Sequence, residues 1–392
     1  MWIERNISER LLKTSLSRPV ILLTGARQTG KSSLLVKLFA KSQYITFDHI
    51  QQMESAKESP EHFLAQFQKS TILDEIQYVP EIFRELKVFI DRDRTNYGKW
   101  MLTGSQRFEL MEKVSESLAG RISILNLETL SAHELRNSKL SPIEDHLWKG
   151  GYPELWANKN LDINDFFESY IRTYVERDLK QIVEVKNLTD FRRFIKILAV
   201  RTGQLLNYRD ISNDVGVSDV TIKKWVHALE LSGLIVILPP FYSNIGKRLV
   251  KSPKIYFSDH GLACYLLGIT SLKTWHTHTQ KGNLWENFVL MELIKNHALI
   301  PGGDIFFYRD QNGVEIDFII EKGKKLFFAE AKAGERIDSK KVNFRKVIPL
   351  FNKSYQTESI LIQNLKHNSV LKLKEYYSYN PLYTSYSLST TQ

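Results

Sequence analysis

The chain has 392 residues, of which 43% are hydrophobic and 25% charged, and its formal net charge is +10. This composition excludes collagen-like, coiled-coil and disordered polymers, and the length predicts two or three domains instead of a single core. Residues 251–392 hold 19 basic against 13 acidic side chains, so most of the surplus lies there. Such a surplus favours an anionic partner such as DNA, although a solvated positive face gives the same count.

The only cysteine, Cys264, cannot form an internal disulfide and has no partners at zinc-site spacing. We therefore expect a reducing compartment, the cytoplasm. The longest apolar runs, residues 20–23 and 234–240, are much shorter than the roughly 20 residues of a membrane helix. The N-terminus also lacks the apolar core of a signal peptide. No membrane contact and no cleaved leader are expected.

In the first third of the chain, short apolar runs alternate with helical patterns. The runs are VILLT at 20–24, YITFD at 44–48, TILD at 71–74, KWMLTG at 99–104 and ISILNL at 122–127. Because these runs lack polar alternation, they are typical of parallel strands buried on both faces and joined by crossover helices. The pattern predicts an α/β sheet.

The segment GARQTGKS, residues 25–32, fits the phosphate-loop pattern G-x-x-x-x-G-K-[ST] between a predicted strand and a predicted helix. Its backbone amides are predicted to surround the β-phosphate of ATP. Lys31 would neutralise the β and γ oxygens, and Ser32 would ligate Mg²⁺. The alternative is a chance glycine loop. The predicted nucleotide-binding residues are Gly25, Ala26, Arg27, Gln28, Thr29, Gly30, Lys31, Ser32 and Ser33.

The third apolar run ends in two carboxylates, Asp74 and Glu75. Parallel sheets bind ligands at the carboxyl ends of their strands. Asp74 is therefore predicted to hold Mg²⁺ through water, and Glu75 to orient or deprotonate the water that attacks the γ-phosphate. An ordinary acidic turn is the alternative, and the pair is persuasive only together with Lys31.

With GARQTGKS, ILDEIQ, LTGSQ, SLAGR and GGYPE, the chain resembles prokaryotic AAA+ ATPases that carry a C-terminal winged helix and an endonuclease-like region. The resemblance implies that Ser105 senses the γ-phosphate. It implies that Arg121, or alternatively Arg107, acts as an arginine finger on a neighbouring copy in a homo-oligomer. It also implies that Pro153 packs on the adenine. The alternatives are a turn serine, a surface salt bridge at Arg121 and a helix-breaking turn at Pro153.

The middle of the chain predicts helices followed by a winged helix-turn-helix. A short helix over 208–216 ends near Gly216, Ser218 caps a helix over 219–233, and strands 234–238 and 254–257 follow. In the helix over 219–233, an apolar stripe is predicted to face inward and polar side chains outward. The two outward lysines are better suited to contact DNA phosphates than to recognise base edges. The stripe is Val220, Trp225, Val226 and Leu229, and the outward residues are Lys223, Lys224 and His227.

The C-terminal third predicts a helix over 284–296 and strands over 305–310, 314–320 and 325–333. Because side chains alternate on a strand, Glu330 and Lys332 share a face, and Asp317 reaches it across a hairpin turning near Gly323. Two carboxylates and a lysine suit Mg²⁺-dependent phosphodiester hydrolysis, with Asp317 and Glu330 as metal ligands.

Glu286, in the preceding helix, is a further candidate ligand. The D…E-x-K pattern resembles the PD-(D/E)XK restriction-endonuclease-like superfamily, although no proline precedes Asp317. The resemblance implies an α/β nuclease-like domain in which Asp317, Glu330 and Lys332 are catalytic. A family member that keeps the fold only as a binding platform is the alternative.

The sequence therefore predicts an AAA+ P-loop ATPase domain with its lid over residues 1–160. A helical linker and winged helix follow over 161–250, and an endonuclease-like domain over 251–392. ATP and Mg²⁺ are the expected cofactors, and ATP, DNA and further copies of the chain the expected partners. ATP binding and hydrolysis are expected to switch a metal-dependent nuclease. The alternative is a non-nucleolytic ATPase whose C-terminal domain docks nucleic acid or protein.

Overall fold

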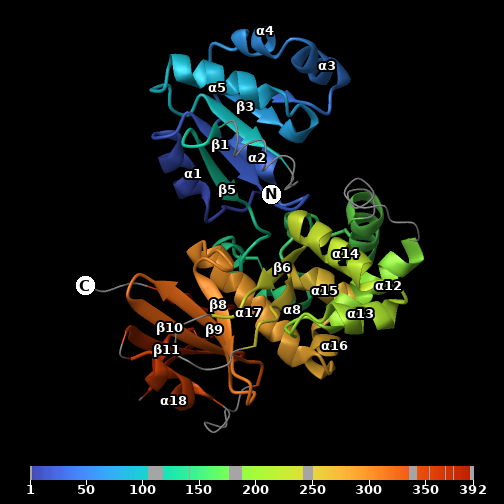
Figure 1. Cartoon of the computed structure of the whole chain (residues 1–392), viewed down its shortest axis with the longest axis vertical. Helices are drawn as coiled ribbons and strands as arrows, with labels where there is room; N and C mark the ends of the chain where they lie inside the picture. Colours follow the sequence, from blue (N-terminus) through green and yellow to red (C-terminus); the bar gives the residue numbers. More distant parts are fainter. Residues whose placement is uncertain are drawn as a thin grey trace. The chain divides into compact units, whose positions relative to one another are not determined.

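The computed structural model describes residues 2–104, 118–140, 142–175, 188–241, 250–334, 342–352, 354–366, 368–373 and 375–388. These residues form two compact units (Figure 1). The P-loop unit comprises Glu4–Glu128 with Leu231–Gly233, and the second unit comprises Met1–Ile3, Thr129–Glu230 and Leu234–Gln392. The boundaries predicted at residues 160 and 250 both fall inside the second unit, so the three-domain division stays a prediction.

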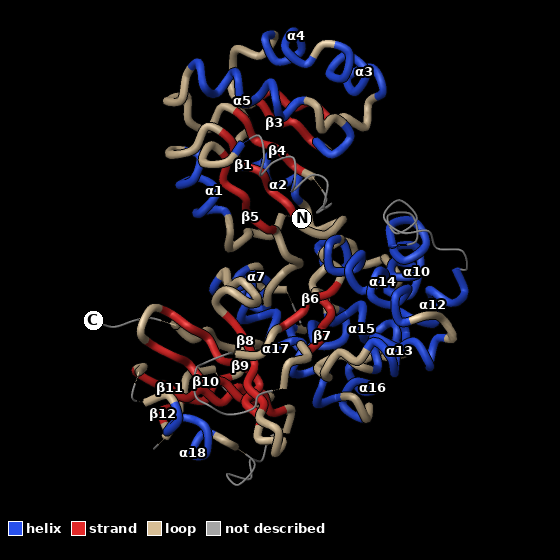
Figure 2. Tube along the Cα trace, in the orientation of Figure 1, coloured by secondary structure: helices blue, strands red, loops and turns tan. Residues whose placement is uncertain are grey.

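A five-stranded parallel sheet forms the centre of the P-loop unit, with helices on both of its faces (Figure 2). Its order is β2-β3-β4-β1-β5, and every neighbouring pair is parallel. The strands are β1 Val20–Thr24, β2 Gln43–Thr46, β3 Thr71–Asp74, β4 Trp100–Thr103 and β5 Ile122–Asn126. Strands β1, β3 and β4 are buried along their whole length because helices cover both faces. The predicted α/β sheet and its five strands are confirmed.

The helices of the P-loop unit pack their apolar stripes on this sheet. They are α1 Ser8–Ser15, α2 Lys31–Leu38, α3 Ile50–Glu58, α4 Pro60–Ala65 and α5 Ile82–Arg92, with a 3-10 turn at Ile76–Tyr78. In α5, for example, Ile82, Leu86 and Ile90 recur every four residues and are buried in the core. The carboxyl ends of β1, β3 and β4 lie side by side, so the residues that follow them gather at one edge.

Helices make up the first part of the second unit. They are α7 Ala132–Asn137, α8 His146–Lys149, α9 Pro153–Ala157, α10 Ile163–Tyr170, α12 Leu188–Val200, α13 Tyr208–Val215, α14 Asp219–Leu231, α15 His260–Leu266, α16 Leu272–Thr277 and α17 Lys281–His297. Short 3-10 turns lie at Ile143–Asp145 and Ile348–Leu350, and a π turn at Ile171–Val175.

Helices α13 and α14 and the antiparallel strands β6 Ile235–Leu238 and β7 Lys254–Phe257 form where they were predicted. Gly216 ends α13 with a left-handed φ of 89°, and the Ser218 hydroxyl accepts a hydrogen bond from the Thr221 N–H at 3.1 Å. The predicted stripe is wrong at Val220, which is 57% exposed, because Ile222 takes the buried position. The buried set Ile222, Trp225, Val226 and Leu229 follows the i, i+3, i+4, i+7 spacing of a helix face.

A six-stranded mixed sheet completes the second unit, in the order β12-β13-β11-β10-β9-β8. Its strands are β8 Ile305–Arg309, β9 Glu315–Lys322, β10 Lys325–Lys332, β11 Gln356–Gln363, β12 Leu371–Lys372 and β13 Tyr377–Tyr379, and α18 spans Phe344–Val347. Strands β8, β9 and β10 are antiparallel neighbours, and β11 runs parallel to β10. Gly323, with a φ of 60°, turns β9 into β10. The predicted helix, strands and turn are confirmed.

The segment that follows β6 lies along the outer edge of β8. The Phe241 N–H donates to the Phe307 carbonyl at 2.7 Å, and the Phe307 N–H donates to the Pro239 carbonyl at 3.2 Å. One apolar core also joins β6, β7 and α17 to β9 and β10. Residues on either side of position 250 are therefore packed together.

Candidate functional site

Three residues of the loop between β1 and α2 have positive φ values. Gly25, Gln28 and Gly30 have φ values of 137°, 61° and 91°. From Gln28 to Gly30 the sign of φ alternates, and such alternation can turn successive N–H groups toward one side and suit an anion. A Cβ at Gly25 would lie 2.3 Å from the Leu127 carbonyl oxygen, so this position requires glycine.

Gly25→Ala is expected to lower the free energy of unfolding by at least about 2 kcal/mol and to weaken ATP binding, because strain and clash both act there. Urea unfolding and calorimetry with ATP measure the two effects. Gly120→Ala is the matched control, since Gly120 also has a left-handed φ of 76° but no atom within 4 Å of the added Cβ. If both variants behaved alike, the close approach to Leu127 would have no effect.

Lys31, the first residue of α2, is held over this loop. Its Nζ donates to the carbonyl oxygens of Gly25 at 3.1 Å and Ala26 at 2.8 Å, and the residue is 7% exposed. The buried Arg5 guanidinium donates to the Thr29 carbonyl at 2.8 Å and to the Glu128 carbonyl. Arg5 thus ties the phosphate loop to the end of the sheet. No motif in the sequence indicated this residue.

Asp74 lies at the centre of a hydroxyl cluster at the same edge. The Ser32 hydroxyl donates to Asp74 Oδ1 at 2.7 Å, and the Thr103 hydroxyl donates to the same oxygen. Tyr44 donates to Oδ2 at 2.6 Å. The structure therefore brings together Ser32 and Asp74, the two predicted Mg²⁺ ligands, and their oxygen donors fit that ion. That they hold metal stays a prediction.

Tyr44 and Thr103 were missed by sequence reasoning. Burial and the neighbouring Asp74 raise the pKa of Tyr44, so its hydroxyl stays a donor to the carboxylate. Thr103 ends β4 and Tyr44 lies on β2, and neither position has a local pattern that marks it.

Glu75 follows Asp74 with a left-handed φ of 58°, which costs a non-glycine residue about 1 kcal/mol. Its N–H donates to the Thr103 hydroxyl at 3.2 Å, and its carboxylate accepts a hydrogen bond from the Gln77 amide. Glu75 is thus the first residue after β3, and its backbone is fixed to the end of β4. Its role as a base stays a prediction.

Arg121 forms a bidentate ion pair with Asp91 of α5, with N–O distances of 2.8 and 3.0 Å. The hydrogen bonds from Arg121 lower the pKa of Asp91. The salt bridge weighed as the alternative is therefore present, and the finger role stays a prediction. Ser105 and Arg107 lie outside the described residues. Pro153 is the first residue of α9, and its contact with adenine stays a prediction.

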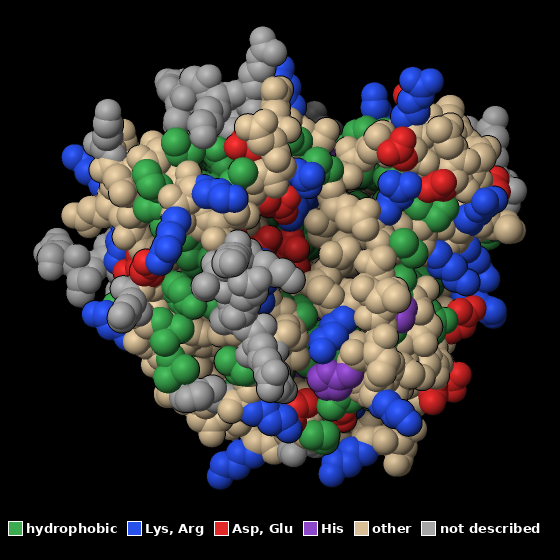
Figure 3. Space-filling model, turned by 90° about the horizontal axis from the view of Figure 1, so that it is seen from below, with side chains coloured by type: hydrophobic (Ala, Val, Ile, Leu, Met, Phe, Trp, Pro, Cys, Tyr) green, Lys and Arg blue, Asp and Glu red, His purple; other side chains and the backbone are tan. Residues whose placement is uncertain are grey.

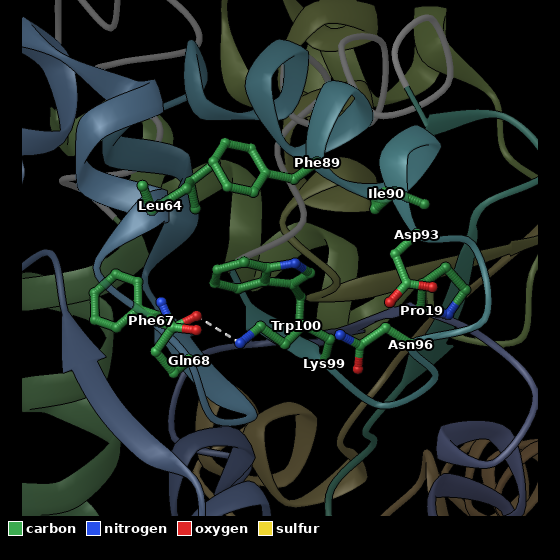
Figure 4. A pocket seen from close by; sticks show the side chains of 11 residues that line it. Pro19, Leu64, Phe67, Gln68, Phe89, Ile90, Asp93, Asn96, Lys99 and Trp100 are labelled. Atoms are coloured by element: carbon green, nitrogen blue, oxygen red, sulfur yellow. Dashed lines mark hydrogen bonds between the residues drawn. The ribbon is translucent and has the colours of Figure 1, made fainter.

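A cavity of about 240 Å³ in the P-loop unit is not the nucleotide site. It is lined by Pro19, just before β1, and by Lys99 and Trp100 at the start of β4, whereas the phosphate loop follows the carboxyl end of β1 (Figure 4). In this cavity Lys99 Nζ donates to the Phe67 carbonyl at 2.6 Å. The cavity therefore lies at the opposite edge of the sheet.

In the second unit, the structure brings together the three predicted residues of the hairpin. Lys332 Nζ lies 2.6 Å from Glu330 Oε2 and 3.6 Å from Asp317 Oδ2. The register that pairs Ala329 with Phe318 puts Glu330 opposite Asp317 at the next position. The Ala331 N–H also donates to Asp317 Oδ2 at 2.8 Å, which orients this carboxylate.

Glu286 of α17 joins these residues together with a carboxylate that was not predicted, Glu315. Carboxylate oxygens of Glu286, Glu315 and Asp317 all lie within 4.8 Å of one another. We refer to Glu286, Glu315, Asp317 and Glu330 as the carboxylate cluster. Clustered carboxylate oxygens fit Mg²⁺ or Mn²⁺, which prefer oxygen ligands.

Lys254 of β7 was also missed, although it is the most buried cation at the cluster. Its Nζ lies 2.8 Å from Glu286 Oε1 and also pairs with Glu315, and its side chain is 2% exposed. The Tyr256 hydroxyl donates to the same Glu286 oxygen at 2.6 Å. A signal did exist, because Lys254 and Tyr256 alternate in the apolar strand KIYF and so share one face.

The cluster is electrostatically strained. Burial and the Asp317 charge raise the pKa of Glu330 to about 8. Burial also raises the pKa of Glu286, against the opposing effect of Lys254. Burial lowers the pKa of Lys332, but the Asp317 and Glu330 carboxylates outweigh it and the net shift is upward. The ammonium groups thus offset only part of the cost of burying these carboxylate charges, whereas the carboxylates keep Lys332 charged.

Three family models match successive parts of the chain. Residues 17–136 match a family described as an AAA domain, whereas residues 140–273 and 281–381 match domains of unknown function, DUF8612 and DUF4143. The chain is 32% identical over 336 residues to the uncharacterized protein Rv2008c of Mycobacterium tuberculosis, covering 85% of this chain and 74% of that protein. The chain belongs to the family of this mycobacterial protein. The uncharacterized protein Mb2031c of Mycobacterium bovis matches with the same identity and coverage.

This chain has an AAA-type P-loop domain, in agreement with its parallel sheet and the loop between β1 and α2. Among solved structures, the Walker-type ATPase PABY2304 of Pyrococcus abyssi is similar at 17% identity with a TM-score of 0.41, over 68% of this chain and 96% of that one. Within the described ranges, no helix has both the length and the apolar character needed to cross a membrane.

Proposed function

We propose that the protein binds and hydrolyses ATP at the phosphate loop and that the bound nucleotide controls the second unit. The observation that carries this proposal is the 2.7 Å contact between Ser32 and Asp74 beside Lys31. In P-loop proteins a hydroxyl and a carboxylate in these positions hold the metal that bridges the phosphates. The match of residues 17–136 to the AAA domain family supports the same assignment.

Each residue of the site would have a separate role in ATP hydrolysis. The loop amides and the Lys31 ammonium would hold the β- and γ-phosphates, while Ser32 and Asp74 would hold Mg²⁺. Bound Mg²⁺ supplies positive charge to the phosphate oxygens. The Glu75 carboxylate would orient the attacking water and accept its proton. The Thr103 hydroxyl would hold the Asp74 carboxylate and the Glu75 backbone in place, since it forms a hydrogen bond with each of them.

Glu75→Gln is expected to reduce the rate of ATP hydrolysis about 100-fold or more, because the amide cannot accept a proton. ATP affinity is expected to stay within about threefold of wild type, since the change removes charge but not volume. Phosphate release and calorimetry with Mg–ATP provide the two measurements. Glu81→Gln, an exposed position at the start of α5, is the control. Wild-type turnover by Glu75→Gln would place the base elsewhere.

We propose a second activity for the second unit, Mg²⁺-dependent cleavage of DNA. It is supported by the convergence of Asp317, Glu330 and Glu286 around two lysines. Helix α17 also precedes the β9–β10 hairpin, which is the order of elements on which the sequence resemblance rests. Asp317, Glu330 and Glu286 would hold the metal, and Lys332 would steady the hydroxide or the developing charge.

Exposed lysines of α14 would help to hold DNA through its phosphates. Lys223 and Lys224 are exposed, as predicted for the second helix of a winged helix. On the face shown in Figure 3, Lys and Arg side chains are scattered around acidic side chains that gather in a hollow near the middle. Scattered lysines favour nonspecific contact over base reading.

Plasmid DNA incubated with the protein, Mg²⁺ or Mn²⁺ and ATP tests the second activity. Nicked product that appears only with metal supports cleavage. Intact plasmid under every condition favours the alternative, an ATPase whose second unit docks nucleic acid or protein.

A further inference from the structure

Lys254 enters the carboxylate cluster from outside the hairpin that holds the D…E-x-K residues. It is the first residue of β7, which pairs with β6, and α17 and β8 come later in the chain. Burying an ammonium group is unfavourable unless carboxylates compensate it. Here the partners are Glu286 at 2.8 Å and Glu315. These two partners are also among the three carboxylates that cluster at metal-ligand spacing.

We propose that Lys254 is a tethered cation that occupies the position of a divalent ion between Glu286 and Glu315, and so weakens metal binding by the cluster. The inference rests on the metal-dependent activity proposed above. A divalent ion at about 2.1 Å from a carboxylate oxygen needs the lone pairs that the ammonium now uses. Glu286 Oε1 already accepts hydrogen bonds from both Lys254 and Tyr256. An ion bound by Glu286 would therefore meet both competition for this oxygen and repulsion from the ammonium charge.

Lys332 and Lys254 both contact the carboxylate cluster, but their ammonium groups differ in how easily they can move away from it. Lys332 is 32% exposed, so its ammonium can move toward solvent when a metal or substrate binds. Lys254 is 2% exposed, and its backbone is paired on both sides, with Leu238 of β6 and with Leu205. Its ammonium can leave only if β7 moves. Strand β7 is therefore a point at which the metal affinity of the cluster can be controlled.

The test is titration of the whole 392-residue chain with Mn²⁺ by calorimetry, comparing wild type with Lys254→Gln and Lys254→Arg. The glutamine amide keeps a hydrogen-bond donor for Glu286 but removes the charge, whereas arginine keeps the charge. Lys254→Gln is expected to bind Mn²⁺ about tenfold tighter or more, since a unit charge near the ion is removed. Lys254→Arg is expected to bind as wild type does. Lys325→Gln is the control, because Lys325 pairs with Glu358 at 2.8 Å on the same sheet.

The outcomes test separately the proposed metal site and the proposed competition by Lys254. Wild type that binds Mn²⁺ as tightly as Lys254→Gln overturns the competition by Lys254 but leaves the metal site standing. Absence of Mn²⁺ binding in every variant overturns both. Binding that is tight in Lys254→Gln and weak in wild type and Lys254→Arg supports both.

Thermal unfolding gives a second readout, which can also be applied to a variant that folds but is less stable than wild type. Without metal, Lys254→Gln leaves Glu286 and Glu315 without their buried cation, so its Tm is expected to fall below that of wild type. Saturating Mn²⁺ is expected to raise the Tm of Lys254→Gln more than that of wild type, because only the folded state holds the ion tightly. An equal or smaller rise in Lys254→Gln would contradict the inference.

Discussion

Lys31→Ala is expected to raise the Kd for Mg–ATP about 100-fold or more and to abolish hydrolysis. Lys31 begins α2, and its ammonium is held over the phosphate loop by the carbonyls of Gly25 and Ala26. A charge-assisted hydrogen bond to phosphate contributes roughly 1.5–3 kcal/mol, and loss of the ammonium also leaves the phosphate charge uncompensated at the reaction step. Calorimetry with Mg–ATP and a phosphate-release assay measure both effects.

Lys37→Ala is the matched control, because Lys37 is exposed in the last turn of the same helix. It removes the same charge from α2 without touching the loop. ATP affinity equal to wild type in Lys31→Ala, or an equal loss in Lys37→Ala, would show that the phosphate loop is not where ATP binds.

Lys332→Ala is expected to lower the rate of DNA cleavage about 100-fold or more and to leave the rate of ATP hydrolysis unchanged. Its Nζ lies 2.6 Å from Glu330, whose side chain is 2% exposed. Without the ammonium, the burial and the Asp317 charge that already raise the pKa of Glu330 would act unopposed. The pKa of Glu330 would then rise further above its value of about 8, so the carboxyl would give up its proton to a metal less readily. Plasmid nicking with Mg²⁺ or Mn²⁺, run beside phosphate release, measures the two activities.

Lys324→Ala, in the exposed turn between β9 and β10, is the control for loss of charge near the site. Glu330→Ala should abolish nicking as Lys332→Ala does. If wild type nicked DNA and both cluster variants did so equally well, cleavage would occur elsewhere in the chain or in another protein of the preparation.

The two sites differ in how far the sequence could predict them. The phosphate loop is a continuous segment between a strand and a helix, so its residues are recognisable from spacing alone. Asp317, Glu330 and Lys332 were also accessible, because alternation on two strands of one hairpin brings them to one place. Lys254 joins Glu286 across 32 positions of sequence, and Arg5 joins Glu128 across 123. No local pattern encodes such pairings.

In helix α14, too, the sequence alone did not give the tertiary packing, here within a single helical turn. Its start, its cap at Ser218 and its three central buried residues were predicted, but Val220 was placed inward where the structure buries Ile222. Both assignments fit an apolar helix. Only packing against neighbouring segments selects the phase of the buried face.

The sequence by itself determined the five strands of the P-loop sheet, strands β8, β9 and β10 of the second sheet, the phosphate loop and the D…E-x-K residues, because these depend on apolar runs, glycine positions and spacings of a few residues. Strands β11, β12 and β13 were not predicted. The tertiary structure alone decided which charges meet. Tyr44 and Thr103 reach Asp74, and Lys254 reaches Glu286, because separate strands and a helix pack together. The reason is physical, since a buried charge is compensated by whatever partner the packed core brings within a few ångströms, however distant in sequence.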